Sequence, residues 1–225
     1  MRVAPLSIWA WKGKDKTMQE RADILGDLVY QASILTHTNP LGITPAFALA
    51  YAIFRMLGSP HGEEVQDPMP FHKDGFVEQL NQIYMETCHF EKRLKQHGFG
   101  SGGDINVFSG MLDQIINHVK KFRKKNSRAE VLLQSIVDSC ILPIAKQNTT
   151  TNIYTPNHCF SLASVTHSLV AGLLLKDTRF LGSLQYMYMS GGDTDTVGAM
   201  FGGLVGAYIG HTVPWTKKIK PYYVN

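Results

Sequence analysis

Apolar residues recur at helical spacing along almost the whole chain. Between residues 22 and 35 they fall three or four positions apart, an interval that places them on one face of an α-helix. This run follows Thr17-Met18-Gln19-Glu20, in which the threonine and the glutamate are spaced so that each side chain caps a backbone N–H of the other. No stretch alternates persistently between apolar and polar residues, and no short hairpin turns separate β-branched runs. The pattern predicts an all-α protein.

The same pattern predicts further helices, separated by polar loops. Proline is favourable in the first turn of a helix and glycine just after its end, so Pro45 and Gly58 bound the second predicted helix. Ser127-Arg128-Ala129-Glu130 is a second capping box. The predicted helices after the first cover residues 45–57, 74–97, 107–125, 129–146, 160–175 and 194–210. We expect one domain over residues 1–225, without internal repeats.

The last predicted helix carries a glycine at every fourth position, at Gly198, Gly202, Gly206 and Gly210. Each internal glycine costs about 1 kcal/mol of helix propensity relative to alanine, and close approach by a second helix can offset that cost. We therefore predict a helix at the centre of a bundle, with its glycine face against a neighbour. The spacing also marks membrane helix pairs, but the apolar run 197–210 is too short to span a bilayer, and no segment reaches about 18 apolar residues. We predict no membrane span.

The formal net charge of +4 comes mainly from one basic cluster. The cluster holds a single aromatic residue, Phe122, and no nucleic-acid-binding motif surrounds it. We interpret it as a solvated helix end, which makes a nucleic-acid partner the least favoured class of function. The basic residues are Lys120, Lys121, Arg123, Lys124, Lys125 and Arg128.

The three cysteines, Cys88, Cys140 and Cys159, are far apart and form no C-x-x-C motif. Their number and spacing argue against a disulfide framework or a zinc ribbon, and favour a reducing compartment. Residues 1–10 have one basic residue and a short apolar run interrupted by Pro5, which we interpret as folded structure rather than a signal peptide. These features favour the cytoplasm, with the nucleus or an organelle left open.

The segment 190–198, Ser-Gly-Gly-Asp-Thr-Asp-Thr-Val-Gly, holds the strongest chemical signal. Asp193 and Asp195 place two carboxylates two positions apart, and Thr196 adds a hydroxyl. The two glycines before them free the backbone. Hard oxygen ligands on a bendable turn suit Mg²⁺ or a similar cation. In the alternative interpretation, one aspartate only caps the following helix, which leaves the second aspartate unexplained.

Two other motifs share the Asp-x-Asp spacing. A calcium-binding EF-hand loop matches at both aspartates and at Gly198, but it needs an oxygen ligand at Val197 and a bidentate glutamate at Leu204. The phosphatase motif of the haloacid dehalogenase type follows an apolar strand and precedes a large α/β domain. Only 29 residues follow Thr196, and they begin with a predicted helix. Both motifs are therefore disfavoured.

The aspartate motif and the small-residue helix that ends Gly206-Ala207-Tyr208-Ile209-Gly210 closely resemble the C-terminal metal motif of the ADP-ribosylglycohydrolase family. Two further segments are similar to family motifs. Met1-Arg2-Val3-Ala4-Pro5-Leu6 resembles the end of the family's Asn-Gly-Ala-Met-Arg segment, and Leu35-Thr36-His37-Thr38-Asn39-Pro40 resembles its Thr-His helix end. The middle, about residues 59–155, is divergent. The resemblance implies a compact orthogonal multi-helix bundle.

The family chemistry is hydrolysis of the bond at C1″ of the distal ribose of an ADP-ribosyl group. The resemblance implies that Asp193, Asp195 and Thr196 hold Mg²⁺ in a two-metal site, with the two aspartates carrying the catalysis. It places His37, Met1 and Arg2 against the substrate, whereas His158 and His167 have no such support, and we interpret them as structural. The implied partner is an ADP-ribosylated protein or a small molecule that contains ADP-ribose. Serine, arginine and acyl linkages stay open, as does the oligomeric state.

Other family members begin with a Gly-Asp-x-x-Gly helix and a Thr-Asp-Asp-Thr turn, which complete the metal site. This sequence starts after both, so the resemblance implies the C-terminal two-thirds of the domain, with the N-terminal helices missing and a partial metal site. A truncated gene product, a mis-called start and a degenerate pseudoenzyme all fit that pattern. Some relatives serve as eye-lens crystallins, so the alternative to an enzyme is an inactive or structural family member.

Overall fold

The computed structural model describes residues 3–13, 15–58, 72–99, 103–122, 128–177 and 180–210, and within these ranges all regular secondary structure is helical. The predicted all-α class is therefore confirmed. The α-helices are α1 (Val3–Trp11), α2 (Met18–Ile34), α3 (Pro40–Leu57), α4 (Lys73–Gln96), α5 (Val107–Lys121), α6 (Ala129–Ile136), α7 (Leu142–Gln147), α8 (Ser161–Leu175), α9 (Phe180–Met189) and α10 (Thr194–Ile209). A 3₁₀ turn, η1 (Gly103–Asn106), precedes α5, and a π-helical segment, η2 (Val137–Ile141), joins α6 to α7.

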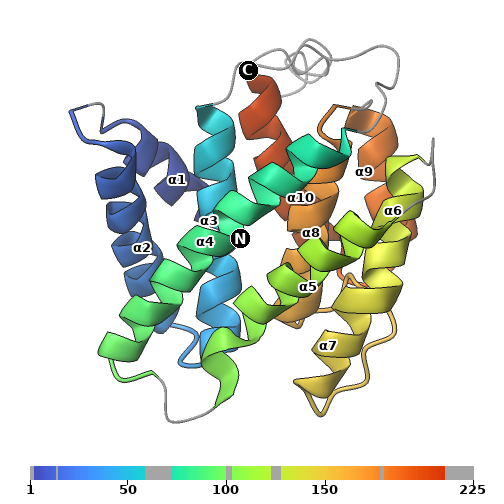
Figure 1. Ribbon diagram of the computed structural model, residues 1–225, viewed down its shortest axis with the longest axis horizontal. Helices are drawn as coiled ribbons and strands as arrows, with labels where there is room; N and C mark the ends of the chain where they lie inside the picture. The colour runs from blue at the N-terminus through green and yellow to red at the C-terminus, as the bar shows by residue number, and fades with distance from the viewer. Residues whose placement is uncertain are drawn as a thin grey trace, which may run out of the picture.

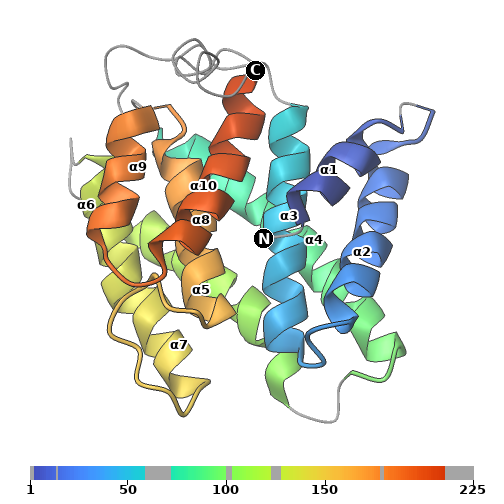
Figure 2. The same cartoon turned by 180° about the vertical axis from the view of Figure 1, so that it is seen from behind.

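Helix α3 is the central element of the bundle. It packs against α1 and α2 on one side, against α4, and against α8 and α10 on the other side. Helices α4 and α5 cross obliquely in front of the upright α3 and α8 (Figure 1). Helix α10 lies behind them, as the reverse view shows (Figure 2). The crossing directions match the orthogonal bundle that the sequence resemblance implies.

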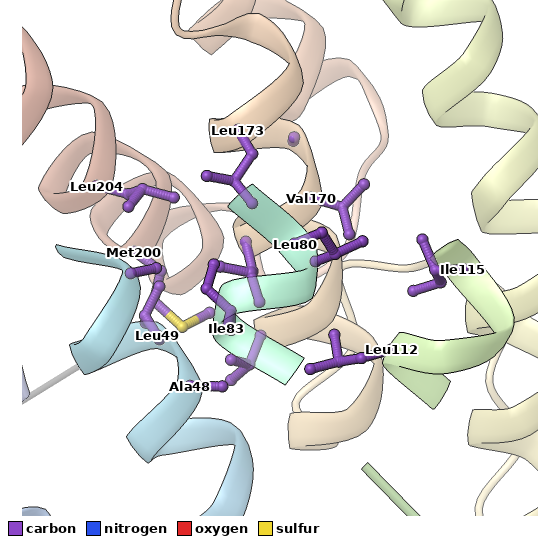
Figure 3. Close-up of a cluster of buried hydrophobic side chains, with 14 of the residues drawn as sticks. Ala48, Leu49, Leu80, Ile83, Leu112, Ile115, Val170, Leu173, Met200 and Leu204 are labelled. Atoms are coloured by element: carbon purple, nitrogen blue, oxygen red, sulfur yellow. The ribbon is translucent and has the colours of Figure 1, made fainter. Parts of the chain in front are cut away.

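The core joins all of these layers through interlocking apolar side chains. Five helices contribute to the cluster in Figure 3, each with two labelled residues. Each fully buried Val, Leu, Ile or Met side chain stabilises the fold by roughly 1.5–3 kcal/mol relative to exposure to solvent. The labelled residues are Ala48, Leu49, Leu80, Ile83, Leu112, Ile115, Val170, Leu173, Met200 and Leu204.

The start of the chain's first two long helices follows local capping chemistry. The Thr17 side chain accepts a hydrogen bond from the Glu20 N–H, and the Glu20 carboxylate accepts one from the Thr17 N–H, so the predicted capping box is confirmed. The prediction that α3 starts at Pro45 is wrong. The helix begins at Pro40, because the Asn39 side chain accepts from the Leu41 N–H and the early proline suits the first turn.

Two more boundaries differ from the prediction. Helix α6 begins after Arg128, whose side chain makes no capping hydrogen bond, and Ser127 of the predicted box lies outside the described residues. The single helix predicted for residues 129–146 is continuous but contains the π-helical segment η2 just before Pro143, a wider turn that accommodates a residue without an N–H. Helix α9 was not predicted, because several of its apolar residues are exposed and no clean stripe forms.

The glycine face of α10 was predicted to pack against another helix, and most of it does not. Around Gly202 and Gly206 no described atom lies within 4 Å of the position that a Cβ would take. Among the α10 glycines with described surroundings, Gly198 has close neighbours in the ring of Tyr188, and Gly203 makes ordinary van der Waals contact with Ala4 and Ile53. Helix α10 is nevertheless central, because it packs against α3 and α8 through its larger apolar residues. These are Val197, Met200, Phe201, Leu204, Val205 and Ile209.

Helix α3 differs from the prediction that no segment is apolar over a membrane-spanning length. Helix α3 spans 18 residues at a mean hydropathy of 1.4, which is long and apolar enough to cross a membrane. In the bundle, 72% of that window is buried against the surrounding helices. Its composition therefore matches a core position, where a helix is apolar all round.

Candidate functional site

The two aspartates of the sequence motif lie at the start of α10. Asp193 takes the N-cap position and Asp195 lies in the first turn. We call residues 190–196 the aspartate loop. Gly191 and Gly192 have φ angles of 66° and 78°, in the left-handed region that favours glycine. The predicted need for backbone freedom just before the aspartates is confirmed.

The carboxylates of Asp193 and Asp195 are close enough to share a hydrogen bond. That bond holds the pKa of Asp195 below its usual value, with smaller contributions from the backbone N–H groups of Thr196 and of Asp195 itself. Adjacent carboxylates repel each other unless a proton or a cation lies between them. Asp195 is exposed and Asp193 is half-buried, so the pair is open to solvent. A hard cation between the two carboxylates would offset that repulsion.

Helix capping does not explain Asp193. Its side chain makes no capping hydrogen bond to α10. Its backbone N–H donates instead to the carbonyl oxygen of Asn157, at 2.6 Å. The positive end of the helix dipole favours a carboxylate in the first turn, which suits Asp195 but does not require a second carboxylate beside it.

The segment 155–161, which leads into α8, holds the aspartate loop in place. The Thr155 hydroxyl donates to the Ser190 carbonyl at 2.8 Å, and the Asn157 side-chain amide donates to the Met187 carbonyl at 2.9 Å. Figure 2 shows this segment beside the connection from α9 to α10. The loop is thus fixed by hydrogen bonds from a part of the chain about 30 residues away.

The same segment reaches the start of α3. Pro45 has no N–H to donate to the carbonyl of Leu41, four residues earlier. The Ser161 hydroxyl donates to that carbonyl instead, at 2.5 Å. Four residues separate Ser161 from Asn157, which is at most about 14 Å of extended chain. The start of α3 and the aspartate loop therefore lie at the same end of the molecule.

His37 is exposed at this end, between α2 and α3. A Cβ added at Gly42 would lie 2.7 Å from Cδ2 of the His37 ring, so the ring packs directly on the first turns of α3. Its Nδ1 lies 2.9 Å from the Thr36 hydroxyl. The predicted substrate contact is thus brought to the same end as the carboxylate pair. The other two predicted substrate contacts, Met1 and Arg2, lie outside the described residues.

A family model described as ADP-ribosylglycohydrolase matches residues 1–222. The chain belongs to the ADP-ribosylglycohydrolase family. The match covers nearly the whole chain, including the middle stretch where the resemblance of motifs is weakest. Neither the search of curated proteins nor that of solved structures found a match.

The oxygen donors at the ADP-ribosylglycohydrolase motif fit magnesium in kind. Asp193, Asp195 and Thr196 offer two carboxylates and one hydroxyl, the hard ligands that Mg²⁺ prefers. Among the residues with described positions, no group of three or more His, Cys, Asp or Glu side chains is placed to hold a metal ion. For a bound Mg²⁺, the described part of the site would supply up to three of about six ligand positions, with water to fill the rest.

Sequence reasoning missed the residues that hold the aspartate loop. His167, interpreted as structural, is indeed buried, but its ring contacts Asn157 and so belongs to the support of this site. Asn157 lies in a polar stretch whose composition is typical of an ordinary loop. The only signal in the sequence is the pair of glycines at Gly191 and Gly192, which predicts a close backbone approach without saying by which segment.

Proposed function

We propose that this family member hydrolyses ADP-ribosyl linkages with the help of Mg²⁺, on an ADP-ribosylated protein or on a small molecule that contains ADP-ribose. Asp193, Asp195 and Thr196 would hold the ion, and His37 would contact the ADP-ribosyl group. The bound ion would supply positive charge next to ribose hydroxyls and a water molecule. The observation that carries the proposal is the solvent-open carboxylate pair at the start of α10, in a chain of this family.

The position of the pair supports this role for two further reasons. The hydrogen bond with Asp193 lowers the pKa of Asp195, and the helix N-terminus favours a negative charge in the first turn, where Asp195 lies. The exposed ring of His37 lies at the same end of the molecule, as contact of both groups with one extended ligand such as ADP-ribose requires. The linkage at the protein side, whether serine, arginine or acyl, is left to the experiment.

A second candidate is a family member without catalytic activity. The observation that favours it is the small donor set, because the described residues contain no cluster of three or more metal-binding side chains. With up to three protein ligands, we expect weak Mg²⁺ binding and slow turnover, since neither substrate nor water is held tightly.

The test combines metal binding with turnover. Mg²⁺ is titrated calorimetrically into wild type, Asp193→Asn and Asp195→Asn, and release of ADP-ribose is measured from ADP-ribosyl-serine and ADP-ribosyl-arginine peptides. We expect both substitutions to remove the binding heat. We expect them to lower any release by about 10²-fold or more, as loss of positioning does.

The matched control is Asp113→Asn on α5, which removes an exposed carboxylate bonded only to Asn117 in the described structure. It should leave both heat and turnover unchanged. Equal heats in wild type and the Asp193→Asn and Asp195→Asn variants would remove the metal site. Asp-dependent heat without release from either peptide would favour the non-catalytic candidate.

A further inference from the structure

Asn157 is a fully buried polar residue whose hydrogen-bonding groups all have partners. Its exposed fraction is 0%, and its carbonyl oxygen accepts the short bond from the Asp193 N–H. Its backbone N–H donates to the Thr155 hydroxyl at 3.2 Å, and its side-chain amide donates to the Met187 carbonyl. Its side-chain oxygen lies 2.7 Å from Nδ1 of His167. One residue thus joins the end of α9, the start of α10 and the middle of α8.

These contacts determine the orientation of both side chains. The Met187 carbonyl can only accept, so the NH₂ group of Asn157 faces it and the side-chain oxygen faces His167. That oxygen can only accept, so His167 carries its proton on Nδ1. His167 is itself 1% exposed on α8, a helix whose residues are nearly all buried. The Nδ1–H of His167, which donates to Asn157, is therefore fixed by packing in the core of the bundle.

We propose that Asn157, oriented by His167, is a positioning residue that fixes the backbone of Asp193 and so keeps the Asp193 and Asp195 carboxylates together for Mg²⁺. The proposal rests on the proposed function. Neither residue would be a ligand of the ion. Asn157 acts through its carbonyl oxygen on the N–H of a ligand residue, and His167 acts through the side chain of Asn157.

The arrangement of Asp193 explains why the Asn157 carbonyl can position its backbone. Asp193 is the N-cap of α10, but its side chain lies beside Asp195 and does not cap the helix, so the helix does not compete with a ligand for it. The backbone must then be held by another group, and the bond to Asn157 is the hydrogen bond of the Asp193 N–H. Hydrogen-bond partners one step behind a metal ligand commonly change metal affinity by 10–100-fold when they are removed.

The experiment measures Mn²⁺ affinity from the electron paramagnetic resonance signal of the free ion, in titrations up to millimolar metal. We expect His167→Phe and Asn157→Ala to weaken binding by about 10-fold or more. His167→Gln, which restores an N–H donor toward Asn157, should recover most of the affinity. Thr155→Val is milder, because it removes only the hydroxyl bonds to the loop, and it should give a smaller loss.

Thr166→Val is the matched control. Thr166 is buried beside His167 on the same helix, but its hydroxyl donates to the Leu162 carbonyl and approaches Met111, away from the aspartate loop. It should lower the denaturation midpoint without changing Mn²⁺ affinity. All titrations are made at a temperature below the unfolding transition of every variant, which circular dichroism defines.

A readout without metal separates positioning from general stability. The Asp193 amide proton should exchange slowly with solvent in wild type, because of its 2.6 Å bond to Asn157. We expect its exchange to be at least about 10-fold faster in His167→Phe, with no change in Thr166→Val, since opening this one bond releases it locally.

The outcomes distinguish the two proposals. If wild type binds Mn²⁺ through Asp193 and Asp195 but His167→Phe, Asn157→Ala and Thr155→Val bind equally well, the positioning role is wrong and the proposed function stands. An Asp193 amide that exchanges at the same rate in wild type and His167→Phe also overturns it. If the substitutions Asp193→Asn and Asp195→Asn leave the wild-type signal unchanged, both proposals fail.

Discussion

At the residue scale, the aspartate loop depends on a position where only glycine fits. A Cβ at Gly192 would lie 2.3 Å from the Asn157 carbonyl oxygen and 2.9 Å from Cγ2 of Thr155. The backbone there has a φ of 78°, so a side chain would also be strained in conformation. Neighbouring Gly191 has a similar φ of 66°, but no described atom lies within 4 Å of its Cβ position. Substitutions at the two glycines therefore separate the cost of a left-handed backbone from the cost of a steric clash.

We predict that Gly191→Ala lowers the free energy of unfolding by about 1–2 kcal/mol, the cost of the left-handed conformation alone. Gly192→Ala should cost about 1–3 kcal/mol more, because the clash with the Asn157 carbonyl adds to that cost. Urea unfolding of both variants beside wild type measures the difference. Equal midpoints for the two variants would show that segment 155–161 does not press against the loop as described.

At the element scale, α10 has two faces with opposite tolerance for a side chain. Its apolar face is closely packed: a Cβ at Gly172 of α8 would lie 2.4 Å from Cδ2 of Leu204. Its glycine face is open at Gly202, where no described atom lies within 4 Å. The close approach between α10 and α8 is therefore made possible by Gly172 of α8, and not by the regularly spaced glycines of α10.

We predict that Gly172→Ala destabilises the protein by about 1–3 kcal/mol through overpacking against Leu204. Gly202→Ala should instead stabilise it by about 0.5–1 kcal/mol, because alanine improves helix propensity where space is free. Thermal unfolding followed by circular dichroism at 222 nm compares both with wild type. A destabilised Gly202→Ala would restore the idea that this face is covered.

At the scale of the whole molecule, two buried groups make stability depend on pH in opposite directions. Burial raises the pKa of Glu91 on α4 to about 7, although its carboxylate accepts from the Ser109 N–H near the start of α5. Burial lowers the pKa of His167 to about 4. Each shift corresponds to about 3 kcal/mol of free energy. Both groups are neutral around pH 5.5, so both are compatible with the core at that pH.

The signs follow from proton binding in the folded and unfolded states. Glu91 holds its proton more tightly when folded, so its contribution is complete below pH 4.5 and is lost as pH rises to about 7. His167 holds its proton less tightly when folded, so its contribution is complete above pH 6.5 and is lost as pH falls to about 4. Between pH 4.5 and 6.5 the two slopes oppose each other.

We therefore predict that single substitutions expose one slope at a time. In Glu91→Gln, the free energy of unfolding relative to wild type should rise by about 3 kcal/mol between pH 4.5 and 7, because the variant has no carboxylate to ionise. In His167→Gln, the free energy relative to wild type should rise by a similar amount as pH falls from 6.5 to 4. Urea unfolding at four pH values tests both. Curves parallel to wild type would mean that these groups are not buried as described.

Much of the fold and part of the site follow from the sequence by itself, because they depend on neighbours along the chain. Helical periodicity, the capping box at Thr17 and the backbone freedom at Gly191 involve groups at most a few residues apart. The adjacency of Asp193 and Asp195 is likewise set by a two-residue interval at a helix start. Such local chemistry is readable without knowing which helices meet.

The tertiary structure alone decided what each helix faces. Trp9 is 62% exposed, and no described atom lies within 4 Å of the Cβ position of Gly202, although both residues belong to apolar helices. The bond from Asn157 to Asp193 joins residues 36 positions apart, and His167 reaches the site only through it. Contacts at such separations depend on how helices cross in three dimensions, which local periodicity does not encode. For this reason the sequence located the carboxylates, and the bundle determined what holds them in place.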